Sequence, residues 1–103
     1  MFRLSYNGEI IGQVVAAKID DNAHLRVRAL NVAAGNMENF TSTRVVDVVF
    51  VDNNVVVNTR SGSSYVFTRM CENHGKSEWQ NAKEDAIKLC EKLAWQIPWW
   101  AAA

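Results

Sequence analysis

Short runs of alternating or β-branched residues, separated by turn residues, fill the first seventy positions of the sequence. Residues 2–6 alternate apolar and polar side chains, which is the period of a half-buried strand. Asn7-Gly8 follows at once and is a strong hairpin signal, because both residues tolerate a positive φ. This pattern predicts an antiparallel sheet. The expected strands lie at about residues 2–6, 9–19, 24–32, 44–51, 55–57 and 64–70.

Two glycines bear on how these strands are arranged. Gly12 interrupts the second run, and a glycine inside a strand indicates a bend or a bulge. Residues 33–39 contain Gly35 and two asparagines, so we expect them to form a loop that crosses between two hairpin or meander units.

The end of the chain has the pattern of one amphipathic helix at about residues 77–97. Ser77 and Gln80 match a capping box at its start. Pro98 ends the helix because proline lacks an amide hydrogen and clashes with the preceding turn. The apolar stripe has helical spacing. It consists of Trp79, Ala82, Ala86, Leu89, Cys90, Leu93 and Ile97.

The predicted fold class is α+β: an antiparallel sheet of five to six strands, in two hairpin or meander units, with one C-terminal amphipathic helix packed on one face. An alternative is a small SH3-like or Sm-like barrel capped by the helix, with closure beginning at Gly12. The 103 residues are the usual size for a single domain. We expect a strand region at about 2–70 and a tryptophan-rich tail at 98–100. The three alanines at 101–103 resemble a cloning remnant and receive no functional weight.

Composition narrows the classes of function. The formal net charge is zero, so the total charge does not indicate a nucleic-acid or anionic-membrane partner. The two cysteines are too few for a disulfide framework. No signal-peptide pattern begins the chain, and no apolar run is long enough to cross a bilayer. We therefore expect a cytoplasmic protein with reduced thiols and no membrane partner.

Catalytic and metal-binding patterns are weak. Cys71, His74, Cys90 and His24 could supply zinc ligands, but tetrahedral sites normally use two closely spaced pairs and only Cys71 and His74 form one. No nucleophile elbow is present, and neither histidine has the context of a catalytic triad. We expect a non-enzymatic protein with no catalytic residue, no metal and no cofactor.

The tryptophans near the C-terminus are the first candidate site. On a helical wheel Trp95 lies about 160° from Trp79, well off the apolar stripe. Trp99 and Trp100 follow the proline that ends the helix. These rings could fold back and close the core, or remain exposed as anchors for a partner, because tryptophan is enriched at interface hot spots. The sequence leaves both interpretations open.

Arginines on the predicted strands are the second candidate site. Arg26 and Arg28 share one strand face. They could join other arginines to bind an anion or a nucleic acid, or pair with carboxylates on neighbouring strands. The formal net charge of zero favours pairing of these arginines with carboxylates over an anion-binding surface. The set is Arg26, Arg28, Arg44, Arg60 and Arg69, with Asp47, Asp52 and Glu9 as the expected carboxylates.

The sequence therefore favours a small protein-binding module. By analogy of size, it is an inhibitor or accessory protein of phage or mobile-element type that acts by occlusion. Its partner is another protein or a second copy in a homodimer. The alternative function is a nucleic-acid or nucleotide-binding domain that uses the arginine-bearing face. The expected interface residues are Trp95, Trp99 and Trp100, with Arg26 and Arg28 as polar contacts.

Overall fold

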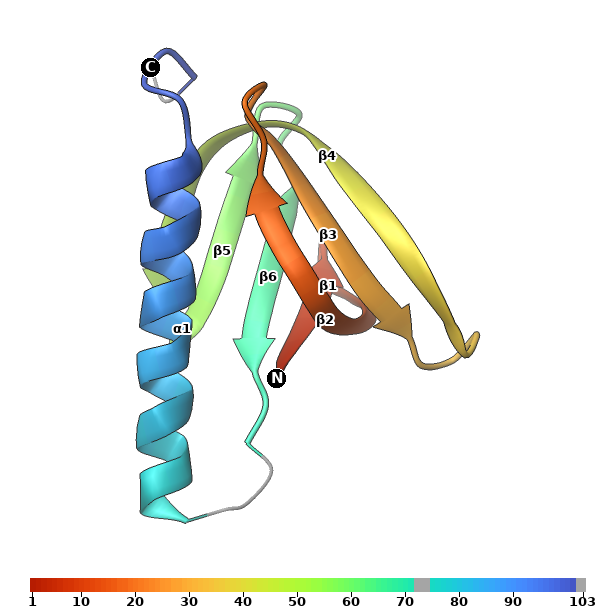
Figure 1. The fold of residues 1–103 in the computed structure, drawn as a ribbon, viewed down its shortest axis with the longest axis vertical. Helices are drawn as coiled ribbons and strands as arrows, with labels where there is room; N and C mark the ends of the chain where they lie inside the picture. Colours follow the sequence, from red (N-terminus) through yellow and green to blue (C-terminus); the bar gives the residue numbers. More distant parts are fainter. Residues whose placement is uncertain (72–74, 102–103) are drawn as a thin grey trace.

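The computed structural model describes residues 1–71 and 75–101. This part of the chain forms six strands followed by one helix (Figure 1). The elements are β1 (Phe2–Tyr6), β2 (Glu9–Ile19), β3 (His24–Asn31), β4 (Asn36–Val51), β5 (Asn54–Thr59), β6 (Ser64–Arg69) and α1 (Lys76–Gln96).

The strands close into a small barrel. Each strand pairs antiparallel with the next in sequence, and β6 pairs back with β1. In that closing ladder Leu4 lies opposite Phe67, and both side chains are fully buried. The α+β class is thus confirmed, and so is the alternative of an SH3-like barrel capped by the helix. The open sheet, which the sequence favoured, is wrong because the two edge strands pair with each other.

Tight turns join most strands as the sequence predicts. Asn7 and Gly8 have φ values of 48° and 90°, and Asp52 and Asn53 have values of 50° and 64°. These pairs occupy the left-handed region that two-residue hairpins require. Asparagine, aspartate and glycine enter this region at lower cost than other residues, which is why hairpins form at these positions.

The prediction of a crossing loop at residues 33–39 is wrong. β4 already begins at Asn36, so the chain reverses between β3 and β4 in a short turn. Gly35 has a φ of 72°, and its amide donates to the carbonyl of Asn31 at 2.7 Å. The Ala34 amide donates to Oδ1 of the same asparagine at 3.1 Å. The six strands therefore form one continuous meander and not two separate units.

The strand β2 is bent where Gly12 passes close to β3. A Cβ atom at Gly12 would lie 2.2 Å from the carbonyl oxygen of Leu30. Beside this point the pairing of β1 with β2 shifts register between Leu4 and Ser5, so Ile11 is the extra residue of a bulge. The predicted bend at Gly12 is confirmed. Bulges of this kind let a long strand curve and so take part in barrel closure.

The helix α1 covers the barrel and completes its core (Figure 1). Ala86 and Leu93 are fully buried in the same cluster as Leu4 and Phe67. The predicted capping box is wrong: Gly75 is the N-cap and forms no side-chain cap hydrogen bond, so Ser77 lies inside the helix.

Trp79 does not belong to the buried stripe, contrary to the sequence prediction. Its side chain is 59% exposed. The first turns of α1 extend past the ends of the strands, so a residue on the barrel side of the helix has no strand to pack against there (Figure 1). Arg69 anchors this part of the helix instead, with its Nε 3.0 Å from Asp85 Oδ2 and its Nη2 3.8 Å from Glu78 Oε1.

Candidate functional site: the tryptophan end and a basic groove

Two tryptophans near the C-terminus project into solvent. Trp95 is 88% exposed and Trp99 is 87% exposed. Trp95 lies on the solvent side of α1 because Ala86 and Leu93 occupy the side that faces the barrel. The core is closed without either ring, so the interpretation that the rings fold back and close the core does not hold for these two residues.

Trp100 has a different environment. It is 42% exposed, and the guanidinium carbon of Arg44 lies 5.0 Å from the centre of its ring, which is a cation–π contact. Ala101 is buried, and its amide donates to the carbonyl of Pro98 at 2.9 Å. The chain thus turns back after α1, so that one ring packs on β4 while Trp99 projects outward. Ala101, one of the three alanines that resemble a cloning remnant in the sequence, is therefore packed against the fold.

A groove of about 680 Å³ lies between the strands β2, β3 and β4 and the last turns of α1. Four cationic residues line it, and no carboxylate does. We call this surface the basic groove and define it by Lys18, Arg26, Arg28 and Lys92.

The groove and the exposed tryptophans lie at the same end of α1. The amide of Ile19 at the end of β2 donates to Gln96 Oε1 at 2.8 Å, which fixes the last turn of the helix against the barrel. Gln96 and Lys92 form the helical wall of the basic groove. Trp95 directly precedes Gln96 and lies less than one helical turn after Lys92, so it belongs to the same turns of α1 as that wall.

One arginine of the groove has an internal partner. Arg26 Nε donates to Asp20 Oδ2 at 2.7 Å. This hydrogen bond, together with one from the His24 amide, holds the pKa of the Asp20 carboxyl below its usual value. Arg28 has no salt bridge within residues 1–71 and 75–101. The groove therefore has an excess of positive charge.

The other predicted arginines do not join this surface. Arg44 contacts Trp100, and Arg69 is paired with α1. Arg60 is exposed in the turn between β5 and β6, where its amide donates to the Arg44 carbonyl at 2.8 Å. The five arginines are thus distributed over the barrel. Among the described residues, none of them pairs with Asp47, Asp52 or Glu9.

Sequence reasoning missed the two lysines of the groove. Lys18 lies opposite Arg26 in the ladder between β2 and β3, so the hairpin register about the turn at residues 20–23 could have revealed it. Lys92 could not have been found in this way, because its position depends on how α1 docks on the barrel.

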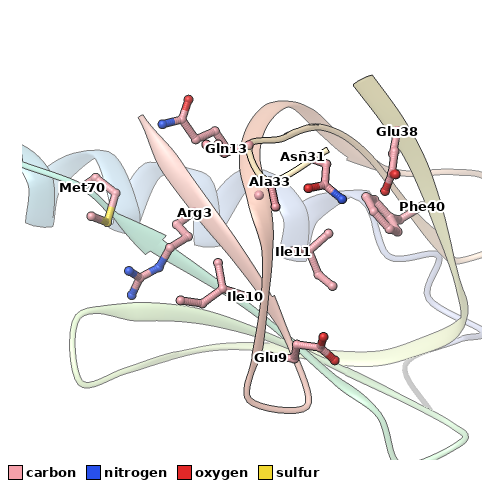
Figure 2. Close-up of a pocket in the computed structure, with 12 residues that line it drawn as sticks. Arg3, Glu9, Ile10, Ile11, Gln13, Asn31, Ala33, Glu38, Phe40 and Met70 are labelled. Carbon is pink, nitrogen blue, oxygen red and sulfur yellow. The ribbon is translucent and has the colours of Figure 1, made fainter. Parts of the chain in front are cut away.

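A second hollow, of about 630 Å³, lies along β2 (Figure 2). Its lining has mixed charge, with Arg3, Glu9 and Glu38. Figure 2 shows Arg3 on one side of β2 and Phe40 with Glu38 on the other, so these side chains do not converge on one point. The Nε of Arg3 is buried, and it has no hydrogen-bond partner among residues 1–71 and 75–101.

The described residues hold no group of three or more histidine, cysteine or acidic side chains placed to bind a metal ion. His74, one of the zinc ligands considered above, lies outside the described residues. Burial raises the pKa of the Cys90 thiol, and the nearby charge of Glu91 adds to the effect.

Comparison with known proteins adds nothing to these observations: no protein-family model, no curated protein and no solved structure matches the chain. Within the described residues, no helix has the length and apolar character needed to span a bilayer. The chemistry of the tryptophan end and of the basic groove is therefore what bears on function.

Proposed function

We propose that the protein is a small, non-enzymatic protein-binding module whose interface is the C-terminal end of α1. The observation that carries this proposal is the exposure of Trp95 and Trp99, at 88% and 87%. An indole side chain buries about 150–250 Å² when covered. At about 25 cal/mol per Å², covering one ring contributes about 4–6 kcal/mol before the costs of association.

The basic groove supplies the polar part of the same interface. Arg26 and Arg28 line the groove together with Lys92 and Gln96 of α1. Aromatic anchors bordered by arginines are a common composition of interface hot spots. The module acts by occlusion, as an inhibitor or accessory protein: the folded barrel presents this end of α1 and covers part of its partner. The partner is another protein or a second copy of the chain.

Replacement of Trp95 and Trp99 by alanine tests the proposal. The double variant should fold normally, because neither ring packs on the core, and should lose complex formation or self-association in sizing chromatography with light scattering. Trp79→Ala is the matched control, since Trp79 is also exposed but lies at the other end of α1. Equal binding by the double variant and the wild type, or its failure to fold, would overturn the proposal.

Nucleic-acid or nucleotide binding is a second candidate, favoured by one observation: the basic groove has four cations and no carboxylate in its lining. An exposed tryptophan near a basic groove can also stack on bases. Fluorescence polarisation with single-stranded RNA and DNA over a range of salt concentrations tests this candidate. Binding through phosphates must weaken steeply as salt rises, so salt-independent binding or no binding would remove it.

A further inference from the structure

We propose that the basic groove binds an acidic polypeptide segment of the partner, so that carboxylates enter the groove while Trp95 and Trp99 bind the adjoining surface. This inference rests on the proposed function, and it names the chemistry of the partner at that same site. It is carried by the four cations that line the groove and by the absence of any carboxylate among its lining residues.

The cations of the groove come from three elements that the fold holds together. Lys18 is on β2, Arg26 and Arg28 are on β3, and Lys92 is on α1. Lys18 lies opposite Arg26 in the ladder, so two positive charges share one face of the sheet. Like charges placed side by side repel each other, and a bound anion relieves that repulsion. The guanidinium groups can in addition bind a carboxylate through two parallel hydrogen bonds.

Carboxylates on a polypeptide fit this surface better than the continuous phosphates of a nucleic acid. Two arginines outside the groove do not extend its positive surface, because Arg69 is paired with carboxylates of α1 and Arg44 stacks on Trp100. Asp20 borders the groove, with its carboxylate 2.7 Å from Arg26, and Asp21 follows it in the exposed turn after β2. A phosphate backbone that continued past the groove would meet these negative charges. A polypeptide can place its carboxylates in the groove alone.

Asp20 should compete with such a ligand. Its carboxylate already binds Arg26 at 2.7 Å, so the partner must displace it or share the guanidinium. The substitution Asp20→Asn removes the negative charge and retains Oδ1, which accepts the amides of Asn22 and His24. An acidic ligand should therefore bind the Asp20→Asn variant more tightly than the wild type.

Fluorescence polarisation at low ionic strength provides the test, because exposed charge pairs are screened least there. The probes are labelled peptides of eight glutamates and of eight serines, and an eight-nucleotide thymidine strand. We expect the wild type to prefer the glutamate peptide over both others. The Arg26→Gln, Arg28→Gln double variant should weaken that binding by about fivefold or more, as expected for the loss of two partly exposed charge contacts. Arg60→Gln, an exposed arginine outside the groove, should change it by less than about twofold.

Three results would overturn the inference: no preference for glutamate over serine, equal losses in the Arg60→Gln control, or tighter binding of the thymidine strand. The readout is distinct from that of the proposed function. In one case the Trp95→Ala, Trp99→Ala variant no longer binds the partner, but the wild type does not bind the glutamate peptide. That result would support the proposed interface and refute only the acidic ligand. In the other case the glutamate peptide binds through Arg26 and Arg28, but the Trp95→Ala, Trp99→Ala variant still binds the partner. That result would refute the proposed interface and support the acidic ligand of the groove.

Discussion

Replacing Gly12 by alanine should strongly destabilise the barrel. The new Cβ would lie 2.2 Å from the carbonyl oxygen of Leu30 and 2.9 Å from its carbonyl carbon, whereas ordinary contact begins at 3.4 Å. The two backbones would have to separate by roughly 1 Å, and both belong to paired strands that cannot move independently. Overpacking of this kind costs about 3 kcal/mol. For a domain of this size that loss lowers the melting temperature by about 10–20 °C.

Urea unfolding followed by far-ultraviolet circular dichroism measures this loss directly. Gly75→Ala is the matched control, because it adds the same methyl group where no atom of the described residues lies within 4 Å and φ is −79°. The control should lose at most about 1 kcal/mol, because alanine is a poorer N-cap than glycine but its methyl group meets no clash with the described residues. If Gly12→Ala and Gly75→Ala are equally stable, the close approach of β2 to β3, and with it this account of barrel closure, is refuted.

Three further predictions concern the helix, the turn and a thiol. Leu93→Ala should cost about 2–5 kcal/mol of unfolding free energy, because Leu93 joins α1 to the barrel core. Asp20→Asn should lower stability at neutral pH, measured by urea unfolding. The extra unfolding free energy of the wild type is fully present above the ordinary carboxyl pKa of about 3.9, and it is lost as the pH falls through the lower pKa of Asp20 in the folded protein. The two proteins should therefore have the same unfolding free energy in strong acid. Cys90 should react with iodoacetamide more slowly than free glutathione at mildly alkaline pH, because burial raises its pKa and the thiolate is the reactive form; an equal rate would contradict that environment.

Local chemistry made much of the fold predictable. Asn7-Gly8 and Asp52-Asn53 specify hairpin turns through the backbone conformations they allow, and the spacing from Ala82 to Leu93 specifies the buried face of α1. Closure was harder to predict. The pairing of β1 with β6 joins residues that are 59 to 67 positions apart, and no periodicity within either strand indicates it.

The errors have local causes as well. Residues 36–43 of β4 are largely polar and exposed, so they lack the apolar pattern of the rest of that strand and resemble the crossing loop that the sequence predicts. Trp79 has the correct helical spacing for the core, but the helix is longer than the barrel it covers. For the site, helical geometry alone indicated that Trp95 faces away from the core. The basic groove depends on tertiary docking that brings Lys92 beside β3.

Acrylamide quenching of tryptophan fluorescence tests the central claim most directly. A variant with Trp79→Phe and Trp100→Phe retains Trp95 and Trp99 as its only tryptophans, which excitation at the red edge of the absorption band selects over Tyr6 and Tyr65. In the free monomer we expect both rings to be quenched nearly as strongly as free indole, as their exposures of 88% and 87% require. In the complex, whether with a second copy or with a partner purified from the native host, at least one ring should become protected and its emission should shift to shorter wavelength. Protection already in the free monomer, or unchanged quenching in the complex, would contradict the account.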